Sequence, residues 1–85
     1  SESILTGPAG RCTLSRKEAA LMEIFLHSRG QTLPRSTLLM KVWGPDSNVE
    51  EGNLDNYIHF LRRRLQNTGS SLQIRTVRGI GYTLS

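Results

Sequence analysis

Four aliphatic side chains recur at helical spacing in the second half of the chain, and they constrain the fold more than any other feature. They are separated by four, three and four positions, which predicts one amphipathic helix over about residues 52–66. The stripe consists of Leu54, Ile58, Leu61 and Leu65. A helix with a single apolar face must pack against other elements. With 85 residues in total, the chain has room for one domain and one core, which we place over residues 1–85.

Shorter patterns before this helix predict two of its packing partners. The Gly7-Pro8-Ala9-Gly10 turn signal lies between residues 4–5 and 11–14, which indicates a small hairpin. Ser15 and Glu18 then form a capping box, and helical periodicity continues to Gly30, so we expect a helix over about residues 15–29.

The remaining elements lie on either side of the long helix. Residues 35–43 carry Leu38, Leu39 and Val42 on one face and predict a short helix that ends at Gly44. Thr32 and Leu33 are expected only to connect to Pro34. Residues 72–84 alternate around Gly79-Ile80-Gly81 and predict a second hairpin. The expected class is α+β: three helices with a short N-terminal hairpin and a C-terminal hairpin.

The charges are unevenly placed. The formal net charge is +4, no acidic residue follows Asp55, and residues 46–55 hold four acids and no base. A basic end beside an acidic loop favours a polyanion on one side, although an ordinary solvated surface explains the charges about equally well.

Several classes of protein are disfavoured. Cys12 is the only cysteine, which excludes an internal disulfide and a cysteine-based metal site and fits a reducing cytoplasm. No apolar run reaches the ~20 residues that span a bilayer. The chain has no signal peptide and no initiator Met, so we expect it to be part of a longer protein.

The side of the long helix away from the leucine stripe carries residues suited to reading DNA. Asn pairs with adenine, Arg pairs with guanine, and an apolar side chain packs on the thymine methyl group. Phe60 is the most informative residue, although single exposed apolar side chains are also common. We call this surface the outer face; it consists of Asn53, Asn56, His59, Phe60, Arg63 and Asn67.

Arginines gather near both C-terminal elements. Arg62, Arg63 and Arg64 point in directions about 100° apart, so they cannot share one role, and all three also suit the negative end of the helix dipole. In the last hairpin Arg75 and Arg78 precede two glycines that permit a tight turn and a close approach of a polymer backbone. Arg78 is placed to enter a narrow minor groove.

Four motifs in collinear order resemble the effector domain of OmpR/PhoB-type bacterial response regulators. They are Leu14-Ser15-Arg16-Lys17-Glu18, Leu38-Leu39-x-x-Val42-Trp43-Gly44, Leu54-Asp55-x-x-Ile58-x-x-Leu61-Arg62 and Thr76-Val77-Arg78-Gly79-Ile80-Gly81-Tyr82. The resemblance implies a winged helix-turn-helix that binds double-stranded DNA, with the third helix in the major groove and the C-terminal hairpin, or wing, in the adjacent minor groove.

Together, the residue pattern and the resemblance assign the contacts. Base contacts are expected from Asn56, Phe60, Arg63 and Arg78. Contacts to the DNA backbone are expected from Trp43, Asn53, Tyr57, Arg62, Arg64 and Thr76. The resemblance also implies a loop that contacts RNA polymerase, with Asp46, Asn48, Glu50 and Glu51.

The resemblance further implies a two-component phosphorelay. A sensor kinase would phosphorylate a receiver domain that this chain lacks, and dimers would bind tandem direct repeats, while the isolated domain would be a monomer without a cofactor. Three departures stand out: Phe60 replaces a common arginine, Pro34 replaces a Ser or Thr cap, and the N-terminal strands are short.

Two other functions stay open. A winged helix can bind protein instead of DNA, in which case binding need not weaken steeply with salt. A nuclease would need His27 and His59, but nothing in the sequence brings them together, and Asp55 one turn before His59 is more often simple helix support. We therefore expect no enzymatic activity.

Overall fold

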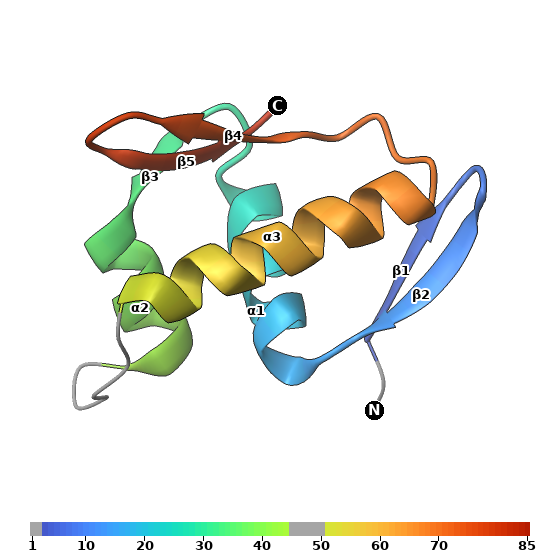
Figure 1. Ribbon diagram of the computed structural model, residues 1–85, viewed down its shortest axis with the longest axis horizontal. Helices are drawn as coiled ribbons and strands as arrows, with labels where there is room; N and C mark the ends of the chain where they lie inside the picture. Colours follow the sequence, from blue (N-terminus) through green and yellow to red (C-terminus); the bar gives the residue numbers. More distant parts are fainter. Residues whose placement is uncertain (1–2, 45–50) are drawn as a thin grey trace.

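The computed structural model describes residues 3–44 and 51–85, which form three helices and five strands (Figure 1). The elements follow the order β1 (Ser3–Gly7), β2 (Gly10–Leu14), α1 (Arg16–His27), β3 (Thr32–Pro34), α2 (Arg35–Trp43), α3 (Glu51–Asn67), β4 (Ile74–Val77) and β5 (Gly81–Leu84). Figure 1 shows α3 crossing the middle of the molecule, with the β1–β2 hairpin at its C-terminal end and the sheet of β3, β4 and β5 along one side. The α+β arrangement of three helices with hairpins at both ends is confirmed.

The first helix begins where the capping box predicts. The Ser15 hydroxyl accepts from the Glu18 backbone N–H at 3.2 Å, and the Glu18 carboxylate accepts from the Ser15 N–H at 2.8 Å. Two orphan N–H groups are thereby satisfied, which fixes the start of α1. The helix ends at His27, two residues earlier than predicted, with Ser28 as its C-cap.

The second helix begins without a side-chain cap, as Pro34 at that position predicts. Its first residue, Arg35, instead donates its backbone N–H to the Ile80 carbonyl at 3.2 Å. A turn of the C-terminal hairpin therefore replaces the missing cap. The third helix is one residue longer at each end than predicted, and Gly69 follows it with φ +72°.

The C-terminal sheet has three strands, where the sequence predicts a two-stranded hairpin. β5 lies in the middle and pairs antiparallel with both β4 and β3. The expectation that residues 32–34 only connect two helices is therefore wrong. Gly81 explains how β3 fits, because a Cβ at that position would lie 2.0 Å from the Leu33 carbonyl oxygen. The small size of Gly81 is needed inside the protein, rather than for the approach of another polymer.

One core joins all three helices to the sheet. The α3 stripe lies at its centre, and each of its four residues is at most 3% exposed. The cluster consists of Leu14, Leu21, Met22, Phe25, Leu33, Leu38, Leu54, Ile58, Leu61, Leu65, Ile74, Tyr82 and Leu84. Because α3 is buried along one side only, its outer face stays exposed at a fixed orientation.

Candidate nucleic-acid interface

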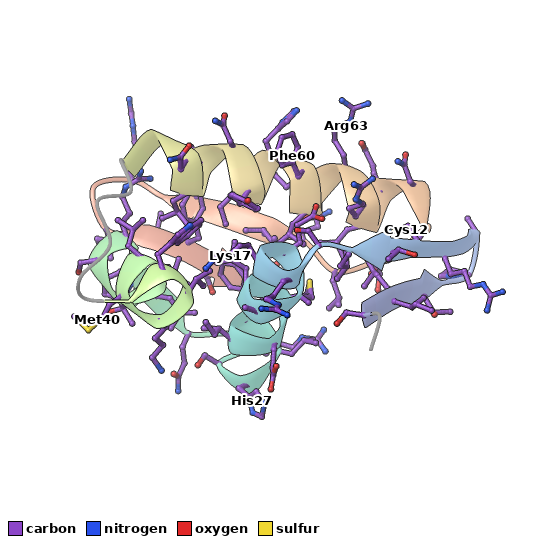
Figure 2. All side chains as sticks on the ribbon, turned by 90° about the horizontal axis from the view of Figure 1, so that it is seen from below. Cys12, Lys17, His27, Met40, Phe60 and Arg63 are labelled. Atoms are coloured by element: carbon purple, nitrogen blue, oxygen red, sulfur yellow. The ribbon has the colours of Figure 1, made fainter. Side chains whose placement is uncertain are left out.

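The outer face of α3 is exposed along its whole length. All six of its residues are solvent-accessible, and Figure 2 shows Phe60 and Arg63 projecting away from the body of the protein. Phe60 is 47% exposed, although it is large and apolar, and it stands among polar and basic neighbours on this face. Phe60, Arg63, Arg64 and Asn67 line a shallow hollow on this surface. The outer face therefore offers amide, guanidinium and aromatic groups from one rigid element.

Aromatic side chains support Phe60 from one flank of α3. Tyr57 makes an edge contact with Phe60, with ring centroids 6.1 Å apart, and a second edge contact with Trp43 at 5.3 Å. Lys17 of α1 lies 5.7 Å from the Trp43 ring and donates to the Val42 carbonyl at 3.0 Å. Such edge contacts are favourable beyond simple burial. Trp43 and Tyr57, both predicted to touch the DNA backbone, are half-buried members of this aromatic row.

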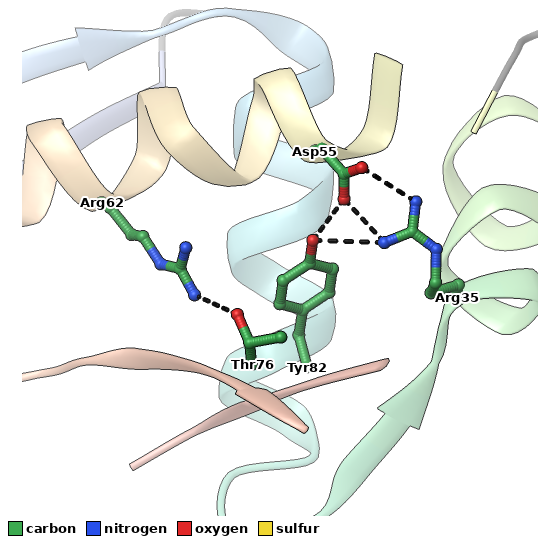
Figure 3. A network of polar contacts seen from close by, with 5 residues as sticks. All are labelled: Arg35, Asp55, Arg62, Thr76 and Tyr82. Atoms are coloured by element: carbon green, nitrogen blue, oxygen red, sulfur yellow. Dashed lines mark hydrogen bonds and ion pairs between the residues drawn. The ribbon is translucent and has the colours of Figure 1, made fainter. Parts of the chain in front are cut away.

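The opposite flank of α3 carries a polar network toward the wing, which we define as residues 74–84 (Figure 3). Arg35 donates to both oxygens of Asp55, from Nη1 at 2.6 Å and from Nη2 at 3.1 Å. The Tyr82 hydroxyl donates to the same carboxylate and accepts from Arg35 Nη1 at 3.2 Å. The network thus joins the first residue of α2, the first turns of α3 and the middle strand of the sheet.

Charge and burial explain the ionisation of this network. Hydrogen bonds from Arg35 and then from Tyr82 hold the pKa of Asp55 below its usual value, because both stabilise the carboxylate. The same carboxylate raises the pKa of Arg35. Burial, followed by the hydrogen bond to Asp55, raises the pKa of the Tyr82 phenol. At neutral pH the network therefore holds an ionised acid between a cation and a neutral phenol.

Arg62 is directed at the wing as well. Its Nε donates to the Ile74 carbonyl at 2.9 Å. Its Nη2 donates to Thr76 Oγ1, also at 2.9 Å (Figure 3). The guanidinium also lies 5.7 Å from the centre of the Tyr82 ring, where a cation–π contact is favourable. Arg62 and Thr76, both predicted to contact the DNA backbone, are thus bonded to one another.

Arg64 lies next to a buried acid of the first helix. Its Nε is 3.5 Å from Glu18 Oε2, and Glu18 is only 4% exposed. These two atoms form an ion pair without a hydrogen bond. The predicted backbone contact of Arg64 must therefore use the part of its side chain that remains exposed.

The wing turn exposes one arginine and one aliphatic side chain. Arg78 is exposed, and Ile80 beside it is 54% exposed. The turn is closed by the Ile80 N–H, which donates to the Val77 carbonyl at 3.0 Å, and Gly79 adopts φ +74°. A side chain at Gly79 would be strained, so the glycine is needed for the turn itself.

The remaining predicted residues divide into two groups. Asn53, Asn56 and Arg63 are exposed on α3 together with Phe60, so the base-facing positions of the helix do share one surface. Asp46, Asn48 and Glu50 lie outside the described residues. Glu51 is the first residue of α3, but its side chain also lies outside the described part.

Sequence reasoning missed Arg35 and Tyr82. Tyr82 stands inside a motif that the sequence identified, but without a role. The one available signal was Asp55 itself, because it is the last acid in the chain and lies among amide and basic groups on α3. Its position did not identify Arg35 or Tyr82, which come from other elements.

The histidines are far apart. Figure 2 shows His27 on the opposite side of the molecule from Phe60, whose ring lies beside that of His59 at 6.1 Å. His27 lies 3.8 Å from Glu23, one turn earlier on α1. Within residues 3–44 and 51–85, no cluster of His, Cys, Asp and Glu could hold a metal ion. In the same ranges, none of the helices combines the length and the apolar character that crossing a membrane requires.

The chain is similar to curated regulators over a part of their length. The transcriptional regulatory protein DltR of Streptococcus agalactiae serotype III is 42% identical over 71 residues, which is 84% of this chain and 32% of that protein. The response regulator MprA of Mycobacterium ulcerans is 39% identical over 80 residues, which is 94% of this chain and 34% of that protein. The chain therefore spans about a third of the length of these relatives.

A solved structure and a family model agree with these relatives. The crystal structure of the DNA-binding domain of Bacillus subtilis CssR matches with a TM-score of 0.84 at 27% identity, covering 100% of both chains. Residues 10–84 match the family model described as transcriptional regulatory protein, C terminal. The winged fold of response-regulator effector domains is thereby confirmed, and this chain belongs to the family of C-terminal, OmpR/PhoB-type domains of transcriptional regulatory proteins.

Proposed function

We propose that this domain binds double-stranded DNA in a sequence-specific way, with α3 in the major groove and the wing in the adjacent minor groove. The observation that carries the proposal is the outer face of α3, where Asn56, Phe60 and Arg63 are exposed on a helix whose other side is fully buried. A major groove admits one α-helix, and these side-chain types read base edges. The CssR structure, which is described as a DNA-binding domain, supports the same function.

The residues expected to contact DNA then divide into those that read bases and those that face the backbone. Asn56, Phe60 and Arg63 read bases in the major groove, and Arg78 enters the minor groove. Trp43, Asn53, Tyr57 and the exposed parts of Arg62, Arg64 and Thr76 face the sugar–phosphate backbone. Phe60 packs on a thymine methyl group, so the preferred site contains thymine at that position.

In the intact protein, the domain is the output half of a bacterial two-component response regulator. A sensor kinase phosphorylates a receiver domain that precedes it, and two copies then bind tandem direct repeats. Asp46, Asn48, Glu50 and Glu51 contact RNA polymerase. The isolated domain is a monomer, acts in the cytoplasm and catalyses no reaction. The regulatory role is supported by the descriptions of two relatives: DltR is a transcriptional regulatory protein and MprA is a response regulator.

Selection of binding sites from random DNA duplexes tests the proposal. The chain should enrich one short sequence, and its affinity for that sequence should fall steeply with added salt, because phosphate contacts release counterions. A protein-binding domain would enrich no sequence. Phe60→Ala should change the enriched base at one position, at a cost of about 1–3 kcal/mol on the original site.

A matched pair of variants separates the two grooves. Arg78→Ala should weaken binding about five- to tenfold and reduce the preference for a narrow minor groove, while the major-groove sequence stays the same. Arg11→Ala removes an exposed arginine in the first hairpin and should leave the selected sequence unchanged. An unchanged selection profile for Phe60→Ala would contradict its base-reading role.

A further inference from the structure

An acidic side chain on a DNA-reading helix requires an explanation. Asp55 lies one residue before Asn56 of the outer face, and its side chain is 51% exposed. A carboxylate near a polyanion opposes binding through simple Coulomb repulsion. Charge alone would therefore favour a neutral residue at this position.

The contacts of Asp55 indicate what the carboxylate does. It accepts hydrogen bonds from both terminal nitrogens of Arg35 and from the hydroxyl of Tyr82. Arg35 belongs to α2, and Tyr82 belongs to the central strand of the wing sheet. Two hydrogen bonds from a planar guanidinium fix direction as well as distance. The carboxylate is therefore the point at which α2, α3 and the wing are joined by directional bonds.

Further bonds extend this junction to the tip of the wing. The Arg35 N–H donates to the Ile80 carbonyl in the wing turn, two residues after Arg78. Arg35 and Arg62 each lie within 6 Å of the centre of the Tyr82 ring, at 5.8 and 5.7 Å, and Arg62 also holds β4 through Ile74 and Thr76. Both strands of the wing are therefore bonded to α3, β4 through Arg62 and β5 through Tyr82, and the wing turn is bonded to Arg35.

We propose that Asp55 is a positioning residue for DNA binding, which sets the angle of the wing relative to α3 by holding Arg35 and Tyr82. The major and minor grooves of a bound duplex lie side by side, so a helix and a wing whose relative orientation is fixed beforehand bind both grooves with a smaller ordering cost. Asp55 makes no contact with DNA in this role and acts through Arg78, which the wing carries. This inference depends on the proposed DNA-binding function.

A double-mutant cycle on the selected duplex tests the inference with the 85-residue chain. Asp55→Asn should weaken binding to that duplex about three- to tenfold, although it removes a negative charge, because the wing is no longer preorganised. Affinity for a random duplex should stay equal or rise. Arg78→Ala should cost at least about threefold less in the Asp55→Asn background than in the wild type, since a misplaced arginine contributes less.

Two further variants control for charge and for folding. Glu23→Gln removes an exposed carboxylate on α1, which lies 3.8 Å from His27 of the same helix, and should not weaken binding to either duplex. Tyr82→Phe keeps the buried ring and removes only the hydroxyl that donates to Asp55. It should reproduce the loss of specific affinity to a smaller degree, and it carries the test if Asp55→Asn does not fold.

The outcomes separate this inference from the proposed function. If Asp55→Asn binds the selected duplex more tightly, or lowers the melting temperature while Arg78→Ala costs the same factor in both backgrounds, the positioning role is overturned. If the wild-type chain selects no sequence and Arg78→Ala has no effect, the proposed function fails together with the inference. A selected sequence with an Arg78 effect but no Asp55 effect rejects the inference alone.

Discussion

The two flanks of α3 are held to the rest of the protein by different kinds of contact. On the wing side, Asp55 and Arg62 make hydrogen bonds of 2.6 to 3.1 Å to Arg35, Ile74 and Thr76. On the other flank, the Tyr57 ring packs by an edge contact against Trp43 at the end of α2, with centroids 5.3 Å apart, and against Phe60 of its own helix at 6.1 Å. A hydrogen bond weakens steeply as its angle departs from linearity, whereas edge-to-face aromatic pairs form over ring-centroid distances of about 4.5–7 Å and are lost chiefly when a ring is removed.

Because the two flanks are held by different contacts, they should affect different properties of the domain, its stability and its DNA specificity. The aromatic flank keeps α3 seated against α2 and supports Phe60, so it responds mainly to the loss of a ring. The polar flank sets where the wing lies relative to α3, so it responds to the loss of a single oxygen or proton. Stability should therefore depend more on the aromatic flank, and specificity more on the polar one.

The largest expected effect on stability comes from removing the ring between Trp43 and Phe60. Tyr57→Ala should lower the free energy of unfolding by about 2 kcal/mol, because a half-buried ring and two edge contacts are lost. Chemical denaturation measures this change. Tyr57→Phe keeps the ring and should stay within about 0.5 kcal/mol of the wild type. Equal losses for both variants would mean that the hydroxyl, rather than the ring, supports this flank.

An intermediate effect on stability is expected when the Arg62 side chain is removed, and the neighbouring Arg63 provides the control. Arg62→Ala should lower the free energy of unfolding by about 1 kcal/mol, because two hydrogen bonds to the wing are lost at a solvent-exposed position. Arg63→Ala should change it by less than about 0.5 kcal/mol, since Arg63 projects into solvent. Thermal unfolding of the two variants compares them directly. If Arg63→Ala were the more destabilising change, the assignment of the polar flank would be wrong.

The smallest expected effect is the change with pH in the contribution of Asp55 to stability. The pKa of Asp55 is lower in the folded protein than in the unfolded chain, so its contribution to stability is present above about pH 4 and is lost as the pH falls through the folded-state value. Because the side chain is half exposed, that contribution should be only about 0.5 kcal/mol. The stability difference between the wild type and Asp55→Asn should be constant between about pH 6 and pH 8 and shrink below about pH 4. A difference that grows in acid would contradict the ion pair with Arg35.

The helices could be predicted from the sequence because their signals are local. The capping box at Ser15 and Glu18 fixed one helix start, and the leucine stripe placed α3 to within one residue at each end. β3 could not be predicted, since residues 32–34 are too few to show a period and contain a proline. Only their pairing with β5, at the far end of the chain, makes them a strand.

For the candidate site, the exposed residues of α3 could be predicted, but the contacts of its flanking residues could not. Helical geometry identifies the exposed outer face of α3 and therefore Asn56, Phe60 and Arg63. It does not identify which element lies beside each flank, so the partners of Arg62, Arg64 and Asp55 were not foreseen. These contacts depend on how α1, α2 and the wing pack around α3, and periodicity carries no information about that packing.

The last strand of the chain is the central strand of its sheet, and this order matters for synthesis on the ribosome. β3 and β4 emerge earlier but do not pair with one another, because each pairs only with β5. Leu84, one residue from the end, is fully buried in the core. A nascent chain that stops before Gly81 contains the residues of all three helices, but it lacks β5, with which β3 and β4 pair, and it lacks Tyr82 and Leu84 of the core. Folding of this domain therefore finishes only after its final residues have left the exit tunnel.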